Sequence, residues 1–96
     1  MKFEWNPKDP KKAASNLSKH RVAFEEGLTV FADPLAKIFD DKDHSTEEQR
    51  EIIIEHSVNH RLLLVCFAAQ QESVRIFSAR KVTKQERKDY EENVTP

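Results

Sequence analysis

The sequence predicts an α+β fold, in which an antiparallel sheet of about four strands is packed against two N-terminal helices and followed by a C-terminal helix. Three observations predict it. Apolar residues recur at helical spacing in the first third of the chain, three apolar runs follow between residues 51 and 79, and the remainder restarts as a charged helix. Strands joined by such short turns pair antiparallel. The 96 residues are expected to form one domain, residues 1–96.

The N-terminal part should contain a strand and then a helix. Residues 1–5 alternate apolar and charged side chains, which is the period of a half-buried strand. Asp9 followed by Pro10 is typical of a helix start, and this helix should run to about His20. One stripe of the helix forms a basic rim beside its thin apolar face and consists of Lys12, Asn16 and Lys19.

The next segment should hold a second helix and a short strand. Apolar residues recur at helical spacing from Phe24 to Ala32, although Gly27 weakens such a helix by about 1 kcal/mol relative to alanine. The helix should stop at Asp33-Pro34. A short strand is predicted at Lys37–Asp40, and the polar stretch Asp41–Gln49 has the composition of a loop.

Three strands should then form the centre of the sheet. They are predicted at Glu51–His56, Leu62–Ala69 and Ser73–Ala79, and the middle one is apolar on both faces, which indicates a central strand. The single cysteine, Cys66, lies within it and is expected to be part of the core. Because one cysteine cannot form an internal disulfide, a reducing cytosol is favoured.

The last strand leads into a junction that is rich in cations. The chain should turn through Arg80 and Lys81 and restart as a helix, with Thr83 and Glu86 forming a capping box. Cationic side chains and helix-start amides would then point at one place, which predicts a bound anion; a merely solvated charged edge is the alternative. Arg75 would face away from Arg80 in a straight strand, so these two arginines converge only if the chain leaves the sheet before Arg80.

Composition excludes several classes of function. Sixteen basic and seventeen acidic side chains give a net charge of −1, which disfavours a constitutive duplex-binding domain but allows a local basic cleft. Gly27 is the only glycine, which excludes glycine-rich nucleotide loops. His56 and His60 straddle a predicted turn and no Cys/His set has zinc spacing, so we expect no metal and no cofactor. No signal peptide or membrane span is expected, and the predicted location is the cytoplasm.

The chemistry that remains is phosphate chemistry. Arginines stand beside each central strand: Arg50, Arg61, Arg75 and Arg80. RNA cleavage needs no metal if a base takes the 2′-hydroxyl proton, an acid protonates the leaving oxygen and cations stabilise the phosphorane. Possible proton-transfer groups are Lys19, Glu86 and Tyr90, although the capping box is the favoured role of Glu86.

Several short segments, in this order and spacing, resemble one known family: Phe3–Trp5, Asp9–His20, Val22, Phe24–Glu26, Val30–Pro34, Glu48–Arg50, Arg75–Lys81 and Glu86–Tyr90. On these segments the chain resembles the BrnT family of bacterial toxins, ribonucleases with a RelE-like fold, over essentially its full length. It departs from the family pattern at Glu55, where a glycine is common, and this adds negative charge near the proposed cleft.

The resemblance implies a toxin of a type II toxin–antitoxin pair that cuts RNA and arrests translation. Its partner would be a BrnA-like antitoxin with a ribbon-helix-helix DNA-binding end, in a heterotetramer with two copies of each chain that contacts operator DNA through the antitoxin. We expect phosphate binding by Arg50, Arg75, Arg80 and Lys19, with His20, Glu48 and Tyr90 as further site candidates. The alternative is a catalytically inactive binding module that acts only as antitoxin partner and co-repressor; a free DNA-binding domain is disfavoured by the net charge.

Overall fold

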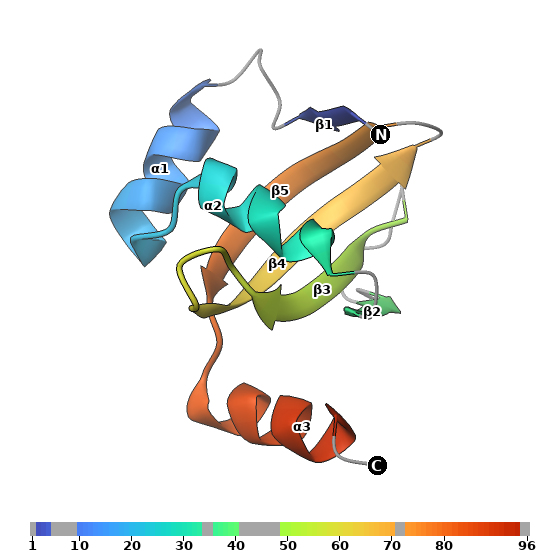
Figure 1. Ribbon diagram of the computed structural model, residues 1–96. Helices are drawn as coiled ribbons and strands as arrows, with labels where there is room; N and C mark the ends of the chain where they lie inside the picture. Colours follow the sequence, from blue (N-terminus) through green and yellow to red (C-terminus); the bar gives the residue numbers. More distant parts are fainter. Residues whose placement is uncertain (1, 5–9, 34–35, 41–48, 71–72, 95–96) are drawn as a thin grey trace.

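The computed structural model describes residues 2–4, 10–33, 36–40, 49–70 and 73–94, and it has an α+β architecture (Figure 1). The elements, in chain order, are β1 (Lys2–Glu4), α1 (Pro10–His20), α2 (Phe24–Leu28), the 3-10 helix η1 (Thr29–Ala32), β2 (Lys37–Asp40), β3 (Glu51–His56), β4 (Leu62–Gln70), β5 (Ser73–Lys81) and α3 (Lys84–Val94). This confirms the predicted fold class and nearly all of the predicted elements. The predicted loop at residues 41–49 lies almost wholly outside the described residues.

The described strands form one sheet in the order β1-β5-β4-β3-β2. Strands β2 to β5 are antiparallel neighbours along the chain, as the short connections between β3, β4 and β5 predict for those three strands. Strand β1 pairs parallel with β5, and in this pairing Phe3 lies opposite Val74. The first strand of the chain therefore extends the antiparallel sheet at its β5 edge.

The core lies between one face of the sheet, called here the near face, and α1, α2 and η1, which all lie on that face (Figure 1). Buried residues of the near face are Ile53, Leu63, Val65, Phe67, Val74, Ile76 and Ala79, and the helical side contributes Val22, Phe24 and Val30. Gly27 is buried where α2 meets β5, and a Cβ there would lie 3.1 Å from the Cβ of Ala79. The glycine that weakens α2 thus lets the helix approach β5 closely.

The second helix is shorter than predicted. α2 ends at Leu28 and continues as the 3-10 helix η1, with the Thr29 hydroxyl donating a hydrogen bond to the Glu26 carbonyl over 2.6 Å. β-branched residues and a hydroxyl that bonds the preceding turn both disfavour a regular α-helix at this point.

Strand β5 contains a β-bulge at Phe77. Cys66 pairs with Ser78, but the next residue, Phe67, pairs with Ile76, so Phe77 is the extra residue. The strand does not leave the sheet before Arg80, as convergence of the arginines was expected to require, but continues to Lys81. Beyond the bulge the alternation is reset, so Arg80 faces the same side as Arg75. We call this side, which is turned away from α1 and α2, the far face.

The last helix begins with the predicted capping box. The Glu86 amide donates to the Thr83 hydroxyl over 3.1 Å, and the Thr83 amide donates to the Glu86 carboxylate over 2.8 Å. Residues of α3 line a hollow together with Ile54 of β3 and Phe39 of β2 on the far face. Among the described helices, none is long and apolar enough to cross a membrane.

Candidate functional site

Three cations surround the ring of Phe77. The guanidinium carbon of Arg50 lies 3.9 Å from the ring centroid and that of Arg75 lies 5.1 Å from it, while the Lys12 ammonium lies 5.0 Å away. We call these four residues the Phe77 cluster. A ring face attracts cations, so it can hold like charges close together at the half-buried surface.

The sheet register explains why the two arginines meet. Arg75 pairs with Ala68, and Glu51 pairs with Phe67, so the register continued by one residue places Arg50 on the other side of Ala68. Alanine is too small to separate the long side chains on either side of it. The β-bulge brings the ring of Phe77 next to the two arginines. The site is therefore formed by residues from β3, β4 and β5.

Lys12 reaches the cluster because α1 is fastened to the edge of β5 by Asn16. The Asn16 amide nitrogen donates to the carbonyls of Ala79 (2.8 Å) and Val22 (2.9 Å), and its oxygen accepts from the Ala79 amide over 3.2 Å. The side chain therefore pairs with the strand edge much as another strand would. Asn16 is 7% exposed, so its predicted place on a basic surface rim is wrong.

A hollow of about 360 Å³ adjoins the cluster and is called here the α1 hollow. It is lined by Lys11, Lys12, Ser15, Asn16, Lys19, His20, Phe77 and Ser78. Phe77 belongs to both the cluster and the hollow, so the predicted site residues Lys19 and His20 line a hollow that adjoins the cluster of Arg50 and Arg75. Among the described residues that line it there are three lysines and no carboxylate, so the hollow favours an anion.

The anion at the strand-to-helix junction is a side chain of the protein itself, the carboxylate of Glu86. The Arg80 guanidinium donates to both oxygens of Glu86, over 2.8 and 2.9 Å. The hydrogen bonds from Arg80 lower the pKa of Glu86 to about 2, and the same pair raises the pKa of Arg80. The idea that the helix start offers an open anion site is therefore corrected, since the Glu86 carboxylate fills it. Phosphate binding by Arg80 would require displacement of Glu86.

Tyr90 lies apart from the Phe77 cluster. Its hydroxyl donates to Glu55 over 3.0 Å and its ring meets the His56 ring edge-on at 5.8 Å. Burial, and then the bond to Glu55, raise the pKa of Tyr90 to about 12. Glu55 is buried and lies five positions along the chain from Arg50, so its charge is not next to the cluster. Glu48, the remaining predicted site residue, is outside the described residues.

Arg61, which the sequence placed among the arginines beside the strands, has a structural partner instead. Its guanidinium contacts both carboxylate oxygens of Glu26, including an Nε–Oε2 bond of 2.9 Å. This pair joins α2 to the start of β4, which leaves Arg50 and Arg75 as the strand arginines of the cluster.

Two residues of the cluster were not predicted as site residues. Lys12 was recognised only as part of a basic stripe, and Phe77 only as an apolar strand residue. The sequence signal for this site is an arginine two residues before Phe77 together with a second arginine on a neighbouring strand. This signal becomes informative only once the strand register is known.

A family model described as "Ribonuclease toxin, BrnT, of type II toxin-antitoxin system" matches residues 9–86. The chain belongs to the BrnT family. The matched range includes every residue of the Phe77 cluster and ends at Glu86, before Tyr90. As a BrnT protein the chain is a ribonuclease toxin, whose substrate is RNA and whose partner is an antitoxin. Membership of a ribonuclease family does not favour the alternative that the chain is a catalytically inactive binding module.

The fold agrees with a solved BrnT structure. The crystal structure of the Brucella abortus ribonuclease toxin BrnT superposes with a TM-score of 0.63 and 23% sequence identity, over 88% of this chain and 99% of that chain. At this identity the likeness concerns the fold. A comparison with curated proteins finds no match.

Proposed function

We propose that the Phe77 cluster and the α1 hollow form the RNA-cleaving site, and that cleavage needs no metal ion. The observation that carries this proposal is the meeting of Lys12, Arg50 and Arg75 on one aromatic ring. A phosphodiester gains negative charge as it passes through a phosphorane, and three fixed cations can stabilise that charge, which is one role a metal ion plays in other nucleases.

The proposed reaction is an attack of the ribose 2′-oxygen on the adjacent phosphorus. A bond forms between the 2′-oxygen and phosphorus while the bond from phosphorus to the 5′-oxygen breaks. The 2′-hydroxyl proton goes to a base, and an acid gives a proton to the leaving 5′-oxygen. The products are a 2′,3′-cyclic phosphate and a free 5′-hydroxyl. No oxidant, cofactor or water is consumed in this step.

His20 is the proposed proton-transfer residue. It is half-buried at the end of α1 and lines the α1 hollow together with Lys12, Lys19 and Phe77. An imidazole can accept a proton through one ring nitrogen and donate through the other, so it suits either half of the reaction. Lys19 adds a cation at the same hollow. In this proposal Arg80 and Tyr90 position α3 through Glu86 and Glu55.

The remaining part of the proposal concerns the biological setting. We propose that cleavage arrests translation in the cytoplasm and that a BrnA-like antitoxin with a ribbon-helix-helix end neutralises the toxin. Two copies of each chain would form a heterotetramer that contacts operator DNA through the antitoxin. The support is the family, which is described as part of a type II toxin–antitoxin system.

The test is cleavage of a defined RNA, free of ribosomes, by the purified chain in excess EDTA, with analysis of the product ends. We expect cleavage that yields 2′,3′-cyclic phosphate and 5′-hydroxyl ends. His20→Ala should slow the reaction by about 100-fold if one proton transfer is lost, whereas His60→Ala at an exposed turn should not. Products with 5′-phosphate ends, or cleavage abolished by EDTA, would contradict the proposal.

A further inference from the structure

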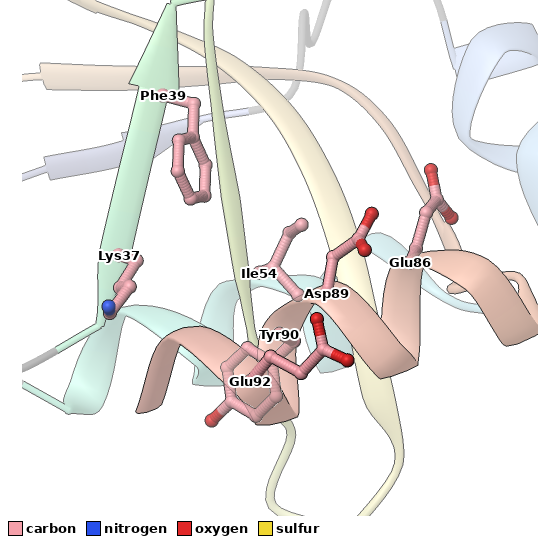
Figure 2. A pocket seen from close by; sticks show the side chains of 7 residues that line it. All are labelled: Lys37, Phe39, Ile54, Glu86, Asp89, Tyr90 and Glu92. Carbon is pink, nitrogen blue, oxygen red and sulfur yellow. The ribbon is translucent and has the colours of Figure 1, made fainter. Parts of the chain in front are cut away.

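A second hollow, of about 340 Å³, lies between α3 and the far face of the sheet. We call it the α3 hollow; its lining residues are Lys37, Phe39, Ile54, Glu86, Asp89, Tyr90 and Glu92. Figure 2 shows α3 running across β3, with Phe39 and Lys37 on the neighbouring strand and the carboxylates of Glu86 and Asp89 on the side of the helix where Phe39 lies. The volume is at the small end of the range for a ligand pocket and suits a few side chains.

The floor of the α3 hollow is apolar. Phe39 leaves 46% of its surface exposed, and Ile54, which lies opposite Lys37 on β3, is half-buried. The face of β2 at Phe39 therefore presents a large aromatic side chain to a hollow instead of to a packed core. An exposed aromatic at the floor of a concave site is typical of a surface that a partner covers.

The rim of the α3 hollow is acidic. Asp89 and Glu92 contribute two carboxylates, while Lys37 contributes one cation. The third carboxylate, Glu86, is bound by Arg80, and Asp89 accepts a hydrogen bond from the Gln85 side-chain amide over 2.9 Å. An occupant that places a lysine or arginine at this rim and an apolar side chain on Phe39 would match both the charge and the floor.

The hollow keeps its shape because α3 is anchored at two points along its length. The Arg80–Glu86 pair holds the first turn, and the Tyr90–Glu55 hydrogen bond holds the helix one turn later. These contacts fix the wall that carries Asp89 and Glu92 relative to the floor formed by Phe39 and Ile54. A partner would therefore meet a site that is already formed, which lowers the ordering cost of binding.

We propose that the α3 hollow is a docking site for a basic and apolar segment of the antitoxin. This inference rests on the proposed function in one respect, which is the explanation of how antitoxin binding stops RNA cleavage. The hollow and the two arginines of the Phe77 cluster lie on the same face of the sheet, because Phe39 and Ile54 share the side of Ile52, Arg75 and Arg80 in the strand register. A segment anchored in the α3 hollow can thus extend over the face where RNA binds, and docking and neutralisation are coupled.

The experiment measures the affinity of purified, labelled antitoxin of the same pair for Glu92→Lys and for its matched control, Glu91→Lys. Both variants make the same charge change on adjacent residues of α3, but only Glu92 lines the hollow. We expect Glu92→Lys to weaken antitoxin binding by about tenfold or more, and Glu91→Lys to change it far less. Equal affinities of the two variants would overturn the proposal.

A second pair of variants tests the apolar floor. Phe39→Ser should weaken antitoxin binding, whereas Val58→Ser should not, because Val58 is 67% exposed and does not line the hollow. RNA cleavage by the free variants is measured separately. Loss of antitoxin binding by a variant that cleaves RNA as fast as the wild type supports docking here. If the wild type proves inactive on RNA, loss of binding by the hollow variants and not by their controls supports it. If Glu92→Lys instead abolishes self-association and leaves antitoxin binding intact, the occupant is a second copy of the chain and the proposal is overturned.

Discussion

Arg75 and Arg80 face the same side of the sheet although they are five positions apart, because Phe77 is the extra residue of a β-bulge between them. Their partners on β4, Ala68 and Leu64, are four residues apart, which is roughly 13 Å along a strand. The two arginines therefore share a face without sharing a site. Arg75 joins Arg50 at the Phe77 ring, and Arg80 binds Glu86.

Phe77→Leu should lower the rate of RNA cleavage while the protein stays folded. Leucine keeps the apolar volume but lacks the ring whose face attracts Lys12, Arg50 and Arg75. We expect kcat/KM to fall about tenfold, and Phe77→Tyr, which keeps a ring face, to remain near the wild type. Equal rates for the leucine and tyrosine variants would show that the ring does not organise the cations.

Asn16→Ala should destabilise the fold. The variant loses three hydrogen bonds and leaves buried backbone groups of Ala79 and Val22 without their partner. We expect the free energy of unfolding to fall by about 2–4 kcal/mol, measured by urea denaturation. Ser18→Ala, an exposed change on the same helix, is the control. A loss no larger than that of the control would mean that Asn16 does not fasten α1 to β5.

The Glu26–Arg61 pair makes stability depend on pH in the acid range. Hydrogen bonds from Arg61, the first cause, lower the pKa of Glu26 from 4.5 to about 2 in the folded protein. Because the folded-state pKa is the lower one, this stabilisation is complete above pH 4.5 and is lost as the pH falls toward 2. The pair contributes at most about 3.5 kcal/mol, since the pKa is lowered by about 2.5 units and one unit corresponds to about 1.4 kcal/mol.

The check compares the free energy of unfolding of the wild type and Glu26→Gln between pH 5 and pH 2.5. The wild type should lose more stability over this interval than the variant, which lacks the titrating carboxyl. Glu25→Gln, on the exposed side of the same turn, should follow the wild type. Parallel curves for Glu26→Gln and the wild type would contradict the assignment.

Thr83→Ala should loosen the start of α3. It removes the hydroxyl that accepts the Glu86 amide bond, and we expect a loss of about 1 kcal/mol in unfolding free energy. Lys84→Ala, at the next residue and exposed, is the control. A stability equal to that of the control would mean that the Arg80–Glu86 pair alone holds the helix start.

Much of the fold follows from local patterns. The strands β2 to β5 and the capping box at Thr83 were predictable because alternation, apolar runs and capping residues can be recognised from residues that are close together in the sequence. The parallel pairing of β1 with β5 was not predicted, since nothing in residues 1–5 identifies a distant partner strand. The end of α2 was missed because the Thr29 hydroxyl competes with helical bonding only in the folded turn.

The candidate site was predictable in its residue types but not in its grouping. Two of the predicted residues, Arg50 and Arg75, contact the ring of Phe77, and two others, Lys19 and His20, line the hollow that adjoins it. The bulge that decides which way Arg80 faces, and the Asn16 contact that brings Lys12 to β5, depend on pairings between distant parts of the chain. Such pairings leave no periodic signal, so the alternation of a straight strand put Arg75 and Arg80 on opposite faces, whereas the bulge places them on the same face.

The central claim is that the Phe77 cluster carries out RNA cleavage, and one comparison tests it most directly. The rate of cleavage of one defined RNA in EDTA is measured for the wild type, Arg75→Ala and Arg87→Ala, after each is shown to be folded. The two variants lose the same charge, but Arg87 lies on the exposed surface of α3. We predict a loss of about 100-fold or more for Arg75→Ala and near wild-type activity for Arg87→Ala. Equal activity of the two variants would contradict the account.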